Sequence, residues 1–220
     1  MDIQIVSGFQ GTGKTTFLNK YLPLLMGKTA VIQNEFGEVP LETGEMAGDL
    51  PVKELNAGCI CCSLALDFRT GIMELVETYH PDHIVIEPSG ISSLSDIIKT
   101  CIRLREKEGI SLKVTKLITM VDIGDYAGWA EELGTFYMDQ IRRGRCIFLR
   151  GFGETTEEEQ VECIRALEQE NPEAVICKED WRKLSDHELM SLIEESGDYL
   201  EETRDVQVRK RALKIRRLGK

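Results

Sequence analysis

With 220 residues, of which 42% are hydrophobic and 30% charged, the chain is long enough for one α/β domain with a short appendage. No apolar run approaches the length of a membrane span and no signal-peptide pattern opens the sequence, so we expect a cytoplasmic protein whose seven cysteines are mostly reduced. The net charge of −11 combines a basic stretch, residues 204–220 with eight basic residues and one acidic residue, with −18 on the rest of the chain. This acidic body argues against nucleic acid as the main partner.

The first motif is a glycine-rich loop between a predicted strand and a predicted helix. Residues 8–16 read GFQGTGKTT and fit the pattern G-x-x-x-x-G-K-[S/T] in full. Backbone N–H groups and a helix N-terminus favour phosphate at such a loop, where Lys14 would bridge the β- and γ-phosphates and Thr15 would bind Mg²⁺. The sequence therefore predicts a nucleoside triphosphate site made of Gly8, Gly11, Thr12, Gly13, Lys14, Thr15 and Thr16.

Strands and helices alternate along the rest of the chain. The hydrophobic pattern predicts strands at 3–6, 29–33, 51–55, 83–86, 112–120, 145–149 and 174–177, and helices at 15–22, 64–79, 94–108, 128–143 and 157–170. This order predicts an α/β fold, a three-layer P-loop NTPase with a mostly parallel sheet covered by helices on both faces. All strand ends, and the motifs that follow them, should then lie along one edge.

Two helices carry more specific predictions. In the helix at 157–170, Val161, Ile164 and Leu167 are expected to share one buried face. Beyond residue 180 a further helix is expected around Leu184, Leu189, Leu192 and Ile193, capped by Ser185 or Asp186.

A cluster of three cysteines, Cys59, Cys61 and Cys62, follows the predicted strand at 51–55. Such close neighbours pair poorly in disulfides but can converge on one cation, and thiolates suit Zn²⁺ and Cu(I). A fourth ligand could be water or a carboxylate such as Glu35, Glu38 or Glu42. A structural cysteine cluster is the alternative.

Another motif, Glu87-Pro88-Ser89-Gly90, closes the predicted strand at 83–86. Glu87 could hold Mg²⁺ through water, and Gly90 could donate an N–H to the γ-phosphate and move once that phosphate is gone. Asp122, at the end of the next strand, is a second candidate for the Mg²⁺ side. The remaining cysteines, Cys101, Cys146, Cys163 and Cys177, are expected in the core.

Together these motifs resemble the CobW/HypB/UreG family of P-loop GTPases, specifically its CobW-like branch. The resemblance covers about residues 1–178 and rests on the P-loop and on three further stretches, residues 34–38 (NEFGE), 54–62 (ELNAGCICC) and 86–90 (IEPSG). Val121-Asp122, Gln140 and residues 171–174 (NPEA) follow in the expected order. The resemblance implies a SIMIBI-class switch that couples GTP hydrolysis to metal delivery. In that picture Cys59, Cys61 and Cys62 hold the transferred ion, often zinc or cobalt, and Glu35 and Glu87 lie on the Mg²⁺ side.

Departures from the pattern of this family bear on the nucleotide and on the domain organisation. Residues 150–153 read RGFG where the base-reading Asn-Lys-x-Asp is expected, so the nucleotide is left open between GTP and ATP. We expect the C-terminal domain usual in CobW-like proteins to be missing, with about forty residues rich in charge in its place. We therefore expect a nucleotide-binding domain at 1–178 and a helical, basic extension at 179–220.

The function predicted from the sequence is that of a Mg²⁺-dependent NTPase, acting as a metallochaperone or metal-insertion switch for a metalloprotein client. Lys14, Glu87 and Gly90 are its candidate catalytic residues. Two alternatives stay open. One is a small-molecule kinase, for which Arg142, Arg143 and Arg145 are the nearest candidates for a basic lid. The other is a slow, nucleotide-gated adaptor for a metalloenzyme. Pairing of two copies across the nucleotide, which this class often shows, is left undecided.

Overall fold

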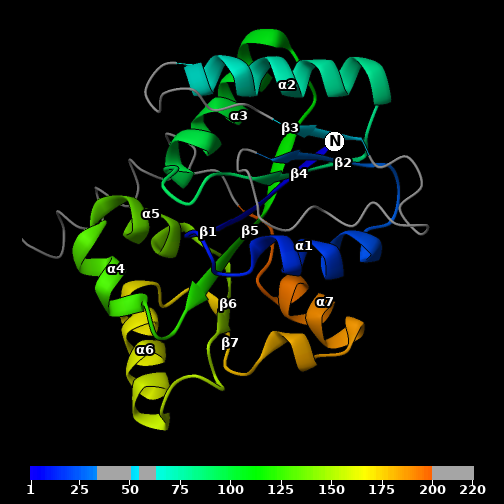
Figure 1. Cartoon of the computed structure of the whole chain (residues 1–220). Helices are drawn as coiled ribbons and strands as arrows, with labels where there is room; N and C mark the ends of the chain where they lie inside the picture. The colour runs from blue at the N-terminus through cyan, green and yellow to red at the C-terminus, as the bar shows by residue number, and fades with distance from the viewer. Residues whose placement is uncertain (34–50, 55–62, 200–220) are drawn as a thin grey trace, which may run out of the picture.

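A seven-stranded parallel sheet forms the centre of the molecule. The computed structural model describes residues 1–33, 51–54 and 63–199. Over these residues the strands follow the order β3-β2-β4-β1-β5-β6-β7, and every neighbouring pair is parallel (Figure 1). The strands are β1 (Asp2–Gly8), β2 (Thr29–Gln33), β3 (Val52–Glu54), β4 (His83–Glu87), β5 (Lys113–Asp122), β6 (Cys146–Arg150) and β7 (Val175–Cys177).

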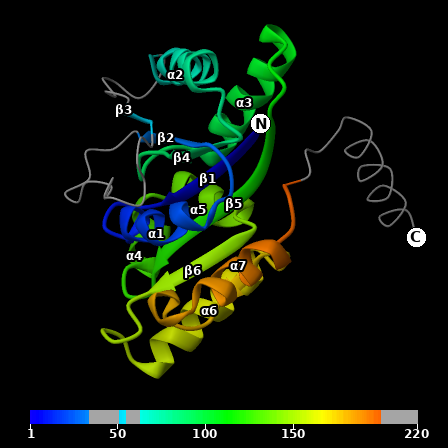
Figure 2. The ribbon, with the colours of Figure 1, turned by 90° about the vertical axis from the view of Figure 1, so that its right-hand side faces the viewer.

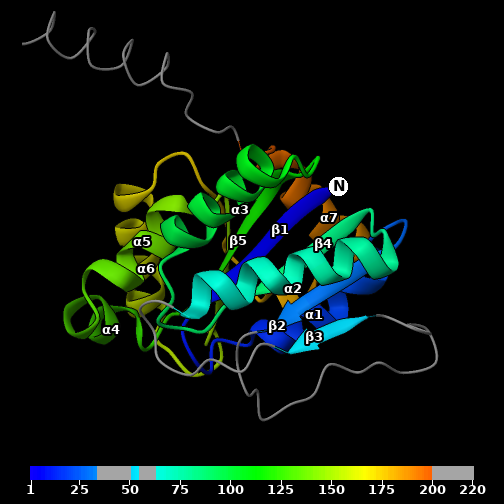
Figure 3. The same ribbon diagram turned by 90° about the horizontal axis from the view of Figure 1, so that it is seen from above.

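Helices cover both faces of this sheet (Figure 3). They are α1 (Lys14–Tyr21), α2 (Ser63–Tyr79), α3 (Leu94–Glu108), α4 (Tyr126–Glu132), α5 (Thr135–Arg143), α6 (Glu157–Glu170) and α7 (Asp186–Glu195), with short 3₁₀ turns η1 (Leu22–Leu24) and η2 (Trp181–Lys183). Apolar side chains of α2 and α3 pack on one face, where α4, α5 and α6 form a neighbouring cluster, and those of α1 and α7 pack on the other. The predicted three-layer α/β fold is confirmed.

The central strands are apolar on both faces because each face is covered. In β4, Ile84 and Ile86 contribute to the core under α2 and α3, whereas Val85 contributes to the core under α1. In β6, Phe148 contributes to the same core as residues of α1 and α7, and Figure 2 shows α7 alongside β6. Such continuous hydrophobic runs are typical of parallel strands.

The predicted helix at 128–143 is wrong in one respect, because the structure has two helices there. Helix α4 ends at Glu132 with Leu133 as its C-cap, and Gly134, with φ of 49°, directly precedes α5. That left-handed conformation is one that glycine adopts easily and that interrupts a helix. The break gives α5 a direction of its own, with Tyr137 buried and Phe136 exposed.

The buried face of α6 also differs from the prediction. Cys163 and Leu167 are buried there and Ile164 is partly buried, whereas Val161 is 53% exposed. Because successive helical residues are turned by about 100°, a face centred on Cys163 leaves Val161 on the far side.

The segment after β7 packs closely on the sheet. Trp181 and two residues of α7, Leu189 and Ile193, are buried in the core beside α1. The hydroxyl of Ser185 accepts from the backbone N–H of Glu188, whose carboxylate in turn accepts from the Ser185 N–H, so Ser185 is the cap of α7. No helix in the described part of the chain combines the length and apolar character that crossing a bilayer requires.

The parallel register brings the described motifs to one edge of the sheet. Gln33 and Glu87 are register partners on β2 and β4, as are Asp122 and Arg150 on β5 and β6. The end of β1 at Gly8 lies between these two pairs of strands. The carboxyl ends of β2 and β4 on one side, and of β5 and β6 on the other, therefore flank the glycine-rich loop.

Candidate nucleotide-binding site

The loop between β1 and α1 has the glycine-dependent backbone of a phosphate-binding loop. Gly8, Gly11 and Gly13 have φ of 144°, 79° and 89°. At Gly8 a Cβ atom would lie 2.6 Å from the carbonyl oxygen of Met120, so no side chain fits there. Gly13 directly precedes the first turn of α1. The loop therefore delivers the chain to a helix N-terminus, where N–H groups and the helix dipole favour an anion.

The side chain of Lys14 folds over this loop and contacts its backbone. Its side chain is only 4% exposed, and Nζ donates to the carbonyl oxygen of Phe9 at 3.2 Å. The same oxygen accepts from the hydroxyl of the buried Thr12 at 2.7 Å. Placing the ammonium over the loop concentrates positive charge at the position where phosphate oxygens would bind.

Thr15 and Glu87 meet at the edge of the loop although 72 residues separate them. The Thr15 hydroxyl donates to Oε1 of Glu87 at 3.1 Å, and the side-chain amide of Gln33 donates to Oε2 at 2.7 Å. Glu87 is 2% exposed. A hydroxyl and a carboxylate held together supply the oxygen ligands that Mg²⁺ prefers, so this pair fits a magnesium site.

Gly90 lies directly against the P-loop backbone. A Cβ atom here would be 2.7 Å from the amide nitrogen of Gln10 and 3.1 Å from two backbone atoms of Phe9. Only glycine permits this approach. The structure thus brings the Gly90 segment and the P-loop together, as the sequence pattern suggested for a γ-phosphate sensor.

Arg150 is a site residue that the motif analysis missed. Its Nε lies 2.8 Å from Oδ2 of Asp122, and its guanidinium also donates to the carbonyl oxygen of Gly11. The other oxygen of Asp122 accepts from the backbone N–H of Gly124 at 3.0 Å. Asp122 thus supports the P-loop through Arg150. A basic and an acidic residue at the ends of neighbouring strands were the signal that could have revealed this pair.

The other proposed metal ligands cannot be placed. Glu35, Cys59, Cys61 and Cys62 lie outside the described residues, as do Glu38 and Glu42. The last described residues before the two segments, Gln33 and Glu54, are register partners at the end of β2 and β3. Within residues 1–33, 51–54 and 63–199 no group of three or more potential metal ligands is found.

The four cysteines expected in the core are buried there. They are Cys101, Cys146, Cys163 and Cys177, all free thiols. Burial raises the pKa of the Cys163 thiol to about 12, and burial likewise raises the pKa of Cys146 and Cys177. These thiols stay protonated near neutral pH, which separates them from thiolate metal ligands.

The candidate nucleotide-binding site lies in a region that matches a known protein family. A model described as the CobW/HypB/UreG nucleotide-binding domain matches residues 2–178. The chain belongs to this family. Its P-loop, Thr15–Glu87 pair and Gly90 all lie inside the matched region.

Curated relatives match the sequence of this chain over part of their length. The zinc-regulated GTPase metalloprotein activator 1 of Dictyostelium discoideum is 34% identical over 148 residues, which is 60% of this chain and 31% of that protein. The zinc chaperone YjiA of Escherichia coli is 37% identical over 106 residues, 44% of this chain and 33% of that protein. The chain therefore matches about a third of the length of these curated relatives.

Solved structures support the fold. Zn(II)-bound YjiA GTPase from Escherichia coli superposes with a TM-score of 0.65 at 20% identity, covering 91% of this chain and 63% of that one. The hydrogenase maturation factor HypB from Archaeoglobus fulgidus gives a TM-score of 0.59 at 15% identity, covering 89% of each chain.

Proposed function

We propose that this member of the CobW/HypB/UreG family is a Mg²⁺-dependent GTPase that couples its nucleotide state to delivery of a transition-metal ion. The observation that carries the proposal is the contact between Thr15 and Glu87 beside a glycine-dependent P-loop. A hydroxyl on the loop and a buried carboxylate on the neighbouring strand would form the Mg²⁺ side of a nucleoside triphosphatase.

The chain's own residues have distinct roles in this proposal. N–H groups of Gly11, Gly13, Thr15 and Thr16 bind the phosphates, with Gly8 and Thr12 shaping the loop. Lys14 binds the β- and γ-phosphates and stabilises the charge that develops during transfer. Thr15 and Glu87, together with Glu35, would hold Mg²⁺, which neutralises phosphate charge. The Gly90 N–H senses the γ-phosphate.

The base is proposed to be guanine, with ATP as the outcome that would revise it. Two relatives carry GTPase in their names, which favours GTP. At the end of β6, where a base-reading motif is expected, the Arg150 guanidinium instead donates to the Gly11 carbonyl of the P-loop. A nucleotide pocket supported in this way differs from one built on Asn-Lys-x-Asp.

The cargo is proposed to be zinc or another transition metal, bound by Cys59, Cys61 and Cys62 and delivered to a metalloprotein client. Relatives named as zinc chaperones motivate the choice of zinc. If nucleotide changes the affinity for the metal, the metal must change the affinity for nucleotide by the same factor. Residues 179–220 are proposed as an extension to the domain at 1–178, and pairing of two copies across the nucleotide is part of the same hypothesis.

A kinase is disfavoured by the position of the arginines that its lid would need. Arg142 and Arg143 end α5 and Arg145 precedes β6, so the cluster lies at the amino end of that strand, whereas the P-loop lies at carboxyl ends. The three side chains are paired with Glu170, Asp139 and Glu173 respectively. A slow adaptor remains the second candidate, and acceleration of hydrolysis by a partner protein would favour it.

The first test is calorimetric binding of GTP and ATP with Mg²⁺, with and without zinc, together with phosphate release in the absence of an acceptor. We expect preference for GTP and acceptor-independent release. Thr15→Val should abolish Mg²⁺-dependent release, whereas Thr100→Val is a matched control because the Thr100 hydroxyl donates within its own helix α3, to the carbonyl of Asp96. Release that requires an acceptor, or that survives Thr15→Val, would refute the proposal.

A further inference from the structure

A buried glutamine on α5 holds the loop that carries Gly90. The side chain of Gln140 is 1% exposed, and its Nε2 donates to two carbonyl oxygens, that of Gly90 at 2.8 Å and that of Ser92 at 3.0 Å. Both hydrogens of the amide are therefore used on one short loop, residues 88–92, here called the Gly90 loop. The Oε1 atom has no hydrogen-bond partner within the described part of the chain.

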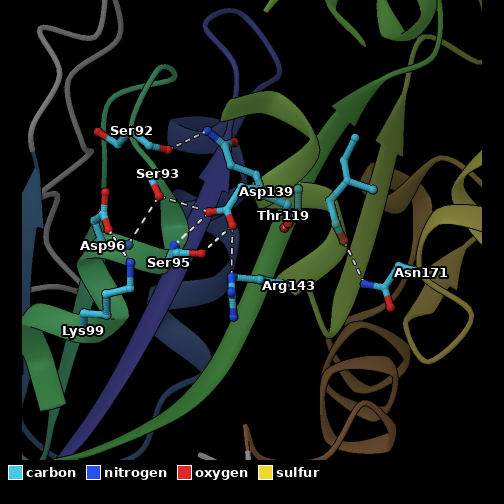
Figure 4. A network of polar contacts seen from close by, with 11 residues as sticks. Ser92, Ser93, Ser95, Asp96, Lys99, Thr119, Asp139, Arg143 and Asn171 are labelled. Atoms are coloured by element: carbon cyan, nitrogen blue, oxygen red, sulfur yellow. Dashed lines mark hydrogen bonds and ion pairs between the residues drawn. The ribbon is translucent and has the colours of Figure 1, made fainter. Parts of the chain in front are cut away.

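The residue before it fixes the next part of the same segment. The carboxylate of Asp139 accepts from the hydroxyl of Ser93 at 3.2 Å, from the backbone N–H of Ser95 at 2.8 Å and from the Ser95 hydroxyl (Figure 4). Arg143 donates to the same carboxylate from one turn further along α5. Burial raises the pKa of Asp139, but the hydrogen bonds from Ser95 and Arg143 outweigh it and lower that pKa.

The position of Gln140 is in turn fixed relative to the P-loop strand. Its backbone carbonyl accepts from the hydroxyl of Thr119 on β5 at 3.1 Å. The Thr119 hydroxyl lies 3.0 Å from that of Ser7, the residue that precedes Gly8. Ser7 and Thr119 are 0% and 1% exposed, so a buried polar path runs from the start of the P-loop to the Gly90 loop.

We propose that Gln140 is the positioning residue that holds the Gly90 loop against the P-loop, so that Gly90 can distinguish a triphosphate from a diphosphate. Because Gln140 binds the Gly90 carbonyl on the α5 side, it fixes the orientation of the loop, and the space beside Gly90 that a Cβ atom would occupy is taken by the Gln10 backbone. Without the Gln140 amide, the carbonyls of Gly90 and Ser92 would lose this donor, which is costly for a buried polar group. The amide therefore also stabilises this conformation of the Gly90 loop. The inference rests on the proposed role of Gly90 as γ-phosphate sensor.

The test compares Gln140→Met with Asn171→Leu in the full chain. Methionine keeps the length of the side chain but removes both donor hydrogens. Asn171 is the matched control because its Nδ2 also donates to two carbonyls, those of Ile141 at 2.8 Å and Gly144 at 2.7 Å, which belong to the C-terminal turn and cap of α5 and not to the Gly90 loop. The measured quantities are the Kd of GDP and of a non-hydrolysable GTP analogue, both with Mg²⁺, and the thermal midpoint.

Gln140→Met should weaken the triphosphate analogue about tenfold relative to GDP, which corresponds to 1.4 kcal/mol. Asn171→Leu should lower the thermal midpoint yet leave the ratio of the two Kd values unchanged. An unchanged ratio in Gln140→Met, or an equal change in both variants, would overturn the inference. If Gln140→Met does not fold, Gln140→Glu, which offers at most one donor hydrogen, takes its place. It is expected to weaken the triphosphate analogue relative to GDP, and an unchanged ratio of the two Kd values would refute the positioning role of Gln140.

The two hypotheses fail in different ways. If the unsubstituted protein binds GDP and the triphosphate analogue equally well, the sensing role of Gly90 is wrong and Gln140 has no discrimination to support. If the unsubstituted protein discriminates between them and Gln140→Met discriminates equally, only the role of Gln140 is wrong.

Discussion

Replacing Glu87 by glutamine is the sharpest test of the magnesium site. The substitution keeps the shape of a side chain that is 2% exposed, and the amide can still bond to Thr15 and Gln33. It removes one negative charge. A Mg²⁺ ion bound to the Thr15 hydroxyl at about 2.1 Å would lie within roughly 5 Å of Oε1, which is 3.1 Å from that hydroxyl.

The magnitude follows from Coulomb's law. One negative charge and a divalent cation about 5 Å apart attract by about 2 kcal/mol in a water-like dielectric and about 7 kcal/mol at an effective dielectric constant near 20. Even the smaller figure corresponds to more than a tenfold loss of Mg²⁺ affinity. The expected result is therefore a rise of at least tenfold in the Mg²⁺ concentration needed for half-maximal GTP hydrolysis.

The assay is a Mg²⁺ titration of phosphate release, with thermal unfolding as a check on the fold. Glu74→Gln is the matched control, because it removes the same charge from an exposed residue on α2 that pairs with Lys53. An unchanged Mg²⁺ midpoint in Glu87→Gln, or an equal rise in both variants, would refute the placement of Mg²⁺ at Glu87.

Three further predictions concern the support of the site. Arg150→Ala should weaken nucleotide binding about tenfold, because it removes the donor to the Gly11 carbonyl and leaves Asp122 without its cation. Arg182→Ala, which removes a more exposed ion pair, should leave nucleotide binding unchanged. Equal nucleotide affinities of the two variants in calorimetry would contradict this prediction. Trp181→Ala should cost about 3–5 kcal/mol and lower the thermal midpoint by about 6–20 °C, since this ring is buried against Phe17, while the exposed Phe136→Ala should shift it little. Asp139 has a lowered pKa in the folded state, so its stabilising effect is present above its ordinary pKa and is lost as the pH falls through about 4 and below. Asp139→Asn should therefore show a smaller loss of thermal midpoint between pH 7 and pH 3.5 than the unsubstituted protein, and an equal loss would count against the stabilising contacts of the Asp139 carboxylate with Ser93, Ser95 and Arg143.

The local features of this fold follow from short stretches of sequence. The glycine-rich loop is recognisable because only glycine tolerates the backbone at Gly8, Gly11 and Gly13, and this requirement is written in consecutive residues. The strand at 29–33 and the helices at 94–108 and 157–170 were predicted with the bounds that the structure has, because hydrophobic period and caps are local signals. The break at Gly134 was missed because its cause is a single backbone conformation inside a periodic pattern.

The contacts between distant residues were decided by the tertiary structure. Thr15 meets Glu87 across 72 residues, Gln140 reaches Gly90 across 50, and Arg150 reaches Gly11 across 139. Each contact depends on strand order, in which β1 lies between β4 and β5 and β6 follows β5. Local propensity carries no information about which strands become neighbours, because that choice is made by burying both faces of the sheet at once. The sequence by itself therefore determined the phosphate loop and the elements around it, and only the assembled sheet determined which side chains support that loop.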